Sequence, residues 1–298
     1  MKETFKSVSF TETNMNILEH AIDTVERYQA MGYVITLRQL YYQLVAKNVI
    51  PNKEREYKRL SRLLTKARMS GLVDWSAIED RNRSPTRLGT FKDLTEFMGA
   101  VKGSFRIDMW ENQPKYVEVW IEKDALSSVF WQVCQTYNCV LMVNKGYGST
   151  SSIYDAYERM SDAISRGSKP IILYFGDHDP SGMQMTEDVE SRLQVMLGET
   201  DQITVERVAL NMDQIREHDP PVNPVKFTDS RSPAYVDRYG DDCWEIDALP
   251  PDVLQGLVKV RIDGLIDHDI WDEDQERHDR LQGKLEWMIE GLDVEDEE

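Results

Sequence analysis

Apolar side chains recur at helical spacing through the first part of the chain. Between residues 11 and 30 they follow one another every three or four positions, which is typical of an amphipathic helix. Thr36 predicts the N-cap of a second helix over residues 37–48, because its hydroxyl can accept from a first-turn amide. A third helix is predicted over residues 53–70, with one apolar stripe and basic side chains on much of its remaining surface.

The order of these elements indicates a DNA-binding module. Three short helices, followed by a charged strand and turn over residues 71–83, are the order of a winged-helix domain. The third helix of such a domain enters a DNA groove. The alternative is that its basic surface is only a solvated helix face. On the first interpretation, the residues that contact DNA are Arg55, Lys58, Arg59, Arg62 and Lys66.

The pattern changes after residue 114. Short apolar runs rich in β-branched and aromatic residues now alternate with helical stretches, which predicts an α/β fold with a mostly parallel, doubly wound sheet. The predicted strands cover residues 116–122, 140–144, 171–177 and 203–210, and the helices cover residues 124–137, 149–166 and 181–197. We therefore expect a winged-helix domain at residues 1–106, an α/β domain at 107–270, and an acidic C-terminal helix and tail at 271–298.

Charge changes this picture in one respect. The chain has 298 residues and a net charge of -18, which at first argues against a nucleic-acid partner. However, residues 36–106 hold 15 Lys and Arg against 7 Asp and Glu, whereas residues 241–298 hold 5 against 20. One N-terminal block is therefore basic inside an acidic protein.

Composition also indicates a compartment. No apolar run approaches the roughly 18 residues of a membrane span, and the polar amino terminus lacks a hydrophobic signal core. Cys134, Cys139 and Cys243 form no CxxC pair, so they predict neither a disulfide framework nor a zinc knuckle. We expect a cytoplasmic protein without a membrane partner.

Acidic side chains follow two of the predicted strands. Glu122 closes one strand, and Asp177 and Asp179 follow another. Residues two apart in an extended chain point the same way, and ligands bind beyond the carboxyl ends of parallel strands. Three carboxylates gathered there repel one another unless a cation lies between them, and oxygen ligands suit Mg²⁺. The alternative is that each carboxylate caps the helix that follows it.

Three further residues have a possible role near the predicted metal site or in the structure. Glu245 and Asp247 share a face and could bear on the metal site, although helix capping also explains Asp247. Strand alternation predicts that His178 points away from the carboxylates and is structural.

Three segments, in this order, resemble the Toprim domain shared by topoisomerases, bacterial primases and some nucleases: VEVWIEKDAL, NKGYGSTSSIYDAY and LYFGDHDPSG. The earlier segment TLRQLYYQL resembles the Arg-x-x-Tyr-Tyr motif of the topoisomerase VI A subunit and its meiotic relative that makes double-strand breaks. The resemblance covers roughly residues 36–210. Within this family, the chain resembles the compact stand-alone A-subunit homologues sometimes called Mini-A. This resemblance implies a winged helix followed by a Rossmann-like Toprim domain.

The resemblance implies a nucleophile. Tyr42, the second tyrosine of the pair, matches the residue that becomes linked to a 5′ phosphate, whereas Tyr41 is expected in the core. Arg38 lies four residues earlier on the same helical face, which suits stabilisation of the ionised phenol and the phosphate. Gln39 stands where the family commonly has Asp, which affects the tuning of the tyrosine. Lys145, in a glycine-flanked turn, is a candidate phosphate contact.

The resemblance also implies a cofactor and partners. Glu122, Asp177 and Asp179 match the acids that bind Mg²⁺, with Mn²⁺ as a possible substitute. The substrate is double-stranded DNA, cut by a homodimer in which the tyrosine of one protomer meets the metal of the other. The chain contains no GxxxxGK motif, so ATP-driven strand passage by a topoisomerase-type isomerase needs a separate ATPase subunit.

Two other functions remain open at the level of sequence. A Toprim nuclease of phage or plasmid conflict would keep the metal site but use water instead of Tyr42 as the nucleophile. A non-catalytic DNA-binding protein would keep only the fold, and replacement of Asp177 would leave its function intact.

Overall fold

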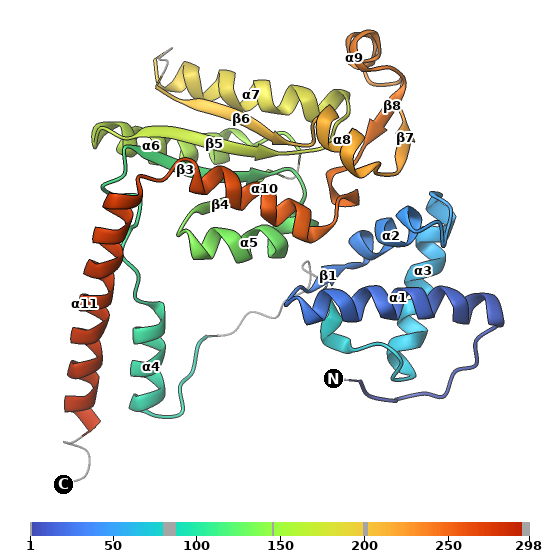
Figure 1. Ribbon diagram of the computed structural model, residues 1–298, viewed down its shortest axis with the longest axis horizontal. Coiled ribbons are helices and arrows are strands. Elements are labelled where there is room, and N and C mark those ends of the chain that lie inside the picture. Colours follow the sequence, from blue (N-terminus) through green and yellow to red (C-terminus); the bar gives the residue numbers. More distant parts are fainter. Residues whose placement is uncertain (1, 80–87, 145, 199–201, 294–298) are drawn as a thin grey trace.

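The computed structural model of the protein describes residues 2–79, 88–144, 146–198 and 202–293 (Figure 1). The N-terminal part consists of α1 (Glu12–Ala30), α2 (Leu37–Ala46) and α3 (Glu54–Met69). Thr36 caps α2 as predicted, in a reciprocal arrangement in which the Gln39 side chain accepts from the Thr36 amide. Each helix begins and ends within a few residues of its predicted bounds.

A small core holds these three helices together. The turn before α2 contains β1 (Ile35–Thr36), and α3 is followed by η1 (Trp75–Ala77) and β2 (Ile78–Glu79), which pairs with β1 in parallel. The buried side chains come from the apolar stripe of each helix, and they include Leu18, Leu40, Leu44, Leu60 and Leu64. The predicted turn of the wing, beyond residue 79, lies largely outside the described residues.

The second part of the chain is an α/β unit with a parallel sheet, as predicted. Its strands are β3 (Lys115–Ile121), β4 (Val140–Val143), β5 (Lys169–Phe175) and β6 (Thr204–Ala209), in the order β4-β3-β5-β6. All neighbouring strands pair in parallel. The central strands β3 and β5 are almost wholly buried, which explains why their sequences are apolar without alternation.

Helices cover both faces of this sheet (Figure 1). The short η2 (Asp124–Leu126) leads into α5 (Ser127–Thr136), which packs with α10 (Pro251–Asp263) on one face. The other face is covered by α6 (Thr150–Ser165) and α7 (Pro180–Met196), which also contact each other. The sheet is therefore doubly wound.

An excursion follows β6 before the chain returns to the sheet in α10. It contains α8 (Met212–His218), β7 (Val222–Pro224), α9 (Ser232–Tyr239), β8 (Asp242–Trp244) and η3 (Ile246–Ala248), with β7 and β8 paired antiparallel. His178, in the loop after β5, forms a bridge to Trp244 of β8. The excursion therefore lies against the loop that follows the central strand.

Two helices extend from the α/β unit as an arm (Figure 1). They are α4 (Leu94–Ser104), in a region whose sequence carries no strong pattern, and α11 (His268–Asp293). Phe105 stacks on His278 with 5.8 Å between ring centroids. The C-terminal helix begins at residue 268, three residues before the predicted bound of the acidic helix and tail, and it continues to Asp293. None of the described helices is long and apolar enough to cross a membrane.

The N-terminal helices lie against η3 and neighbouring parts of the α/β unit. Ala248 of η3 belongs to the core cluster of the N-terminal helices. The Tyr33 hydroxyl donates to the Gln255 side chain at 2.8 Å, and the Asn52 amide donates to Asn223 at 2.9 Å. These contacts place α2 beside the segment that leads from β8 into α10, close to the carboxyl ends of the central strands.

Candidate active site

The candidate site lies where the two central strands end. Ile121 of β3 is paired with Phe175 of β5, and the Glu122 amide donates to the Phe175 carbonyl at 2.9 Å. From here the chain leaves β3 towards α5 on one face of the sheet and leaves β5 towards α7 on the other. A parallel sheet opens into a crevice at such a switch point, which is where ligands bind.

Two glycines make room for the Glu122 carboxylate. Glu122 Oε2 accepts from the Asp177 amide at 2.9 Å. A Cβ atom at Gly176 would lie 2.8 Å from Oε2, and a Cβ atom at Gly182 would lie 3.2 Å from it. The segment FGDHDPSG therefore needs glycine at both positions if the acid after β3 is to approach the loop after β5.

Burial changes the acidity of Glu122. Desolvation, followed by the charge of Asp177, raises the pKa of the Glu122 carboxyl from its ordinary value to about 7. Asp179 adds a smaller effect in the same direction. The three acids predicted from sequence are therefore close enough to repel one another.

Asp177 and Asp179, which follow β5, have different hydrogen-bond partners. Asp177 Oδ1 accepts from the Ile246 amide at 2.8 Å and forms an ion pair with Lys123 at 2.8 Å. Asp179 caps α7, since its Oδ1 accepts from the Gly182 amide at 2.6 Å. The capping alternative thus holds for Asp179.

A lysine that the sequence analysis did not single out lies among the acids. Lys123 Nζ is 2.8 Å from Asp177, 2.7 Å from Glu245 and 2.8 Å from Asp247. Burial lowers the pKa of Lys123, but the charges of Asp177 and Asp247 outweigh it, so this pKa lies above its ordinary value. Its position directly after Glu122 was the only signal in the sequence.

Glu245 and Asp247 do not cap a helix. They lie with Asp177 around Lys123, next to Glu122, and these residues are called the acidic cluster below. Asp247 is fully buried in η3, and it contacts both Lys123 and Arg38. Glu245 is also an ion-pair partner of both cations. Of the two roles that the sequence allowed for Asp247, the structure supports membership of the site.

Helix α2 brings Arg38 and Tyr42 to the same cluster. Arg38 forms ion pairs with Glu245 and Asp247, the latter with 2.8 Å between Nε and Oδ2. Its guanidinium lies 5.7 Å from the centroid of the Tyr42 ring. Burial and the charge of Asp247 raise the pKa of the Tyr42 phenol to about 12, against the opposing effects of Arg38 and Lys123. Tyr42 is therefore a neutral phenol at ordinary pH in this arrangement.

Both tyrosines of the pair are buried. Tyr41 is 4 % exposed, as expected for a core residue, and its hydroxyl donates to the Asn52 side chain at 3.1 Å. Tyr42 is 5 % exposed, which differs from the expectation for a nucleophile that must reach DNA. The cause is the packing of α2 against η3, a contact between segments about 200 residues apart in the chain.

Arg207 is a second residue that the sequence analysis missed. Its guanidinium donates to the carbonyls of Gly176 and Gly182, each at 3.0 Å, and to that of Asp177 at 2.5 Å. These hydrogen bonds hold the loop after β5 in place. A basic residue inside the predicted strand 203–210 was the available signal.

His178 has the structural role predicted for it. The side chain is buried, and Nδ1 lies 2.7 Å from the Tyr235 hydroxyl of α9. Burial lowers the pKa of His178 to about 4, so the ring is neutral at ordinary pH. It anchors the β7–α9–β8 excursion to the loop after β5.

The basic residues predicted to contact DNA lie on α3, except Lys145, which lies outside the described residues. Arg55, Lys58, Arg62 and Lys66 are exposed, and Arg59 is half-buried. They do not touch the acidic cluster at the strand ends.

The acidic residues suit a hard divalent cation in their chemistry, because all their donors are oxygens. Glu122 uses Oε2, and Asp177 and Asp179 each use Oδ1, in the hydrogen bonds above, so one oxygen of each remains without a hydrogen bond among the described residues. As they stand, no three acidic, histidine or cysteine side chains of the described chain form a complete ligand set. The Lys123 ammonium is the cation that the cluster holds.

Comparison with known proteins adds no family. No family model matches the chain, and no curated protein matches its sequence. The function therefore rests on the geometry of the site and on the motifs that its residues form.

Proposed function

We propose that the chain is a metal-dependent DNA-cleaving transesterase of the topoisomerase VI A type. On this proposal, α1–α3 with β1 and β2 form a winged-helix domain, and the α/β unit is a Toprim domain. Tyr42 is the nucleophile, and Glu122, Asp177 and Asp179 hold Mg²⁺ or Mn²⁺. The protein acts as a cytoplasmic homodimer on double-stranded DNA, and strand passage needs a separate ATPase subunit.

One observation carries this proposal. Tyr42 and Arg38, from a helix near the amino terminus, lie beside acids that follow the central strands of a parallel sheet. Asp177 and Asp247 are both close enough to affect the pKa of the Tyr42 phenol. A phenol, a guanidinium and strand-end carboxylates in one place are the groups that a tyrosine-dependent phosphoryl transfer needs.

Tyr42, Arg38 and Lys123 have different roles in the proposed cleavage reaction. Tyr42 Oη loses its proton and bonds to phosphorus, while the 3′ oxygen of the neighbouring nucleotide leaves and takes up a proton. Arg38 and Lys123 favour the ionised phenol, because both lower the pKa of Tyr42. When bound, a divalent cation supplies charge neutralisation for the phosphate oxygens.

The burial of Tyr42 sets a condition on the reaction. A side chain that is 5 % exposed does not reach a DNA phosphate without movement. Either α2 separates from η3, or the N-terminal helices of one protomer exchange to the α/β unit of the other. The second possibility agrees with the dimer that the motif resemblance implies.

Covalent attachment is the decisive test. The protein is incubated with supercoiled plasmid and Mg²⁺ or Mn²⁺, denatured, and analysed with and without protease. We expect DNA that is bound to protein until protease is added, and we expect none with Tyr42→Phe. Tyr41→Phe is the matched control, since it removes the adjacent hydroxyl and should still cleave.

A nuclease that uses water is the second candidate, and the burial of Tyr42 favours it. It predicts cleavage without covalent attachment, at equal rates in the wild type and in Tyr42→Phe. Asp177→Asn should abolish cleavage on both proposals. Cleavage that survives Asp177→Asn would contradict both. DNA binding without cleavage by the wild type, unchanged in Asp177→Asn, would leave a non-catalytic DNA-binding protein as the remaining function.

A further inference from the structure

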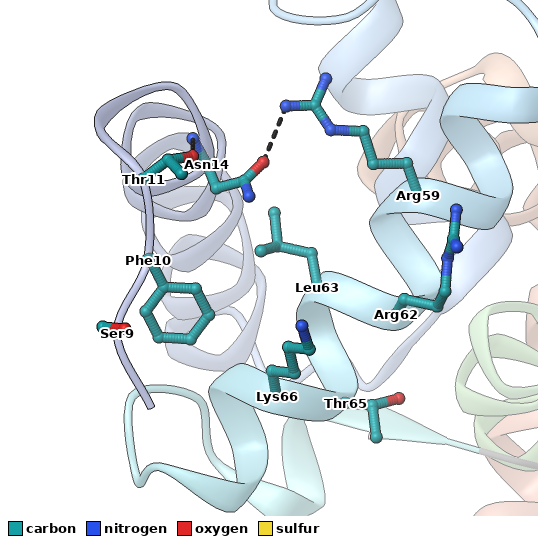
Figure 2. Close-up of a pocket in the computed structure, with 9 residues that line it drawn as sticks. All are labelled: Ser9, Phe10, Thr11, Asn14, Arg59, Arg62, Leu63, Thr65 and Lys66. Carbon is teal, nitrogen blue, oxygen red and sulfur yellow. Dashed lines mark hydrogen bonds between the residues drawn. The ribbon is translucent and has the colours of Figure 1, made fainter. Parts of the chain in front are cut away.

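A groove separates the segment before α1 from one face of α3 (Figure 2). Its volume is about 560 Å³, and its polar lining includes Ser9, Thr11, Arg59, Arg62, Thr65 and Lys66. It lies within the N-terminal helices and does not include any residue of the acidic cluster. Two of the three basic side chains are exposed and one is half-buried.

Arg59 joins the two walls of the groove. Its Nη2 atom donates to Asn14 Oδ1 of α1 at 2.7 Å, as Figure 2 shows, and its Nη1 atom donates to Glu56 at 3.2 Å. Its charge is thus partly neutralised, and its donors are used within the protein. Arg59 shapes the groove more than it offers a free cation.

Arg62 and Lys66 differ from the other basic residues of α3. Arg62 donates through Nε to the Lys58 carbonyl at 3.2 Å, and in the described part of the chain neither Arg62 nor Lys66 has an acidic partner. By contrast, Lys58 pairs with Glu54 at 2.7 Å, and Arg55 pairs with Glu56 at 3.2 Å. Of the five basic residues predicted to contact DNA, the two without an acidic partner in the described part of the chain, Arg62 and Lys66, therefore both line the groove.

The lining matches a phosphodiester. A guanidinium and an ammonium one turn apart, with the Ser9 and Thr11 hydroxyls on the facing wall, provide several donors and no acidic acceptor for a phosphate. Phe10 and Leu63 supply an apolar surface between them, which suits the sugar edge of a nucleotide.

We infer that this groove binds the sugar-phosphate backbone of DNA, with Arg62 and Lys66 as the phosphate contacts. The inference rests on the proposed function and deepens it, because the five residues of α3 that were predicted to contact DNA are no longer equivalent. Contacts to phosphate position a protein on DNA without reading its sequence. The groove therefore fixes where the duplex lies relative to α2.

Two double variants test this directly. Arg62→Gln with Lys66→Gln removes two charges from the groove, and Arg55→Gln with Lys58→Gln removes two charges from the same helix outside it. Binding of a labelled DNA duplex is measured by fluorescence anisotropy in EDTA over a range of NaCl concentrations. Thermal unfolding of each variant confirms that it is folded.

The groove variant should lose about tenfold or more in affinity at low salt, and its plot of log K against log salt should flatten by about 1.8, or 0.9 for each phosphate contact. The outer variant should show a clearly smaller loss, since it changes only net charge. Equal losses would overturn the groove. So would complete displacement of DNA by inorganic phosphate at matched ionic strength, which would identify a site for free phosphate instead.

The outcome is separable from that of the cleavage assay. Binding in EDTA does not depend on Tyr42 or on a metal, so the groove stands if the duplex binds through it but is never cleaved. If the two double variants bind alike while Tyr42 still forms a covalent complex, only the groove is lost. Failure of the wild-type protein to bind DNA would overturn both.

Discussion

The Arg38 guanidinium of α2 lies 2.8 Å from a carboxylate oxygen of Asp247, which is fully buried in η3. Asp247 is also 2.8 Å from the Lys123 ammonium at the end of β3. Asp247 therefore connects α2, which carries Tyr42, with the end of β3, which Glu122 follows. The position of the tyrosine relative to the sheet depends on this ion pair.

Replacing Arg38 by Gln should destabilise the protein and loosen α2. The variant removes one of the two cations that pair with the buried Asp247 carboxylate. Breaking a fully buried ion pair lowers the free energy of unfolding by about 3–5 kcal/mol. Because the Arg38 side chain is 44 % exposed, the expected loss is roughly 1–3 kcal/mol. Urea unfolding measures the change, and hydrogen exchange of α2 reports the loosening. Arg216→Gln, which removes an exposed surface pair, should cost under about 0.5 kcal/mol. Similar losses in both variants would contradict the role of Arg38.

Replacing Lys123 by Met should leave three acids without their shared cation. Removal of the ammonium from Asp177, Glu245 and Asp247 should lower the free energy of unfolding by about 3–5 kcal/mol. Added Mg²⁺ should restore part of this, because the acids are then free to bind it.

The measurement is the melting temperature with Mg²⁺ and with EDTA. The Mg²⁺ effect should be larger in Lys123→Met than in the wild type, and Lys123→Arg, which keeps the charge, should behave like the wild type. Lys169→Met, at the exposed start of β5, is the control for loss of a surface lysine. An identical Mg²⁺ effect in all four proteins would show that these acids do not bind Mg²⁺ when Lys123 is removed.

Glu122 should make stability fall as pH rises in the absence of metal. Its folded-state pKa, about 7, lies above its ordinary value, so the neutral carboxyl stabilises the fold at low pH and ionisation removes that stability as pH rises towards and through 7. In EDTA, Glu122→Gln should therefore gain up to about 3 kcal/mol over the wild type between pH 4.5 and pH 8. Chemical unfolding at several pH values measures the difference. A constant difference across this range would exclude a raised pKa.

Gly182 should not tolerate a side chain. A Cβ atom there would lie 2.3 Å from the Asp177 carbonyl oxygen, which is backbone and cannot easily move. Gly182→Ala should therefore cost about 1–3 kcal/mol and reduce Mg²⁺ binding by displacing the loop that carries Asp177.

The matched control is Gly283→Ala in α11, where a Cβ atom meets nothing within 4 Å. That change should stabilise the helix by up to about 1 kcal/mol, because alanine loses less backbone freedom than glycine. Thermal unfolding compares the two variants. Opposite signs are expected, and equal effects would argue against the close approach at Gly182.

The sequence alone determined the elements whose cause is local. The periodicity of α1, α2 and α3, the cap at Thr36, and the buried strands β3 and β5 all follow from neighbouring side chains. The sequence also places Glu122 and Asp177 at the ends of predicted strands, whereas the structure shows that these two strands are neighbours.

Only the tertiary structure decided which charged groups lie together in the site. Lys123 is the cation of the cluster because η3 brings Glu245 and Asp247 back to β3 from more than 100 residues away. The surroundings of Tyr42 also include distant segments, since Asp247 of η3 and Lys123 after β3 both affect the pKa of its phenol. Local patterns carry no information on such contacts, because the ion pairs and desolvation that set these charges depend on which distant segments pack together.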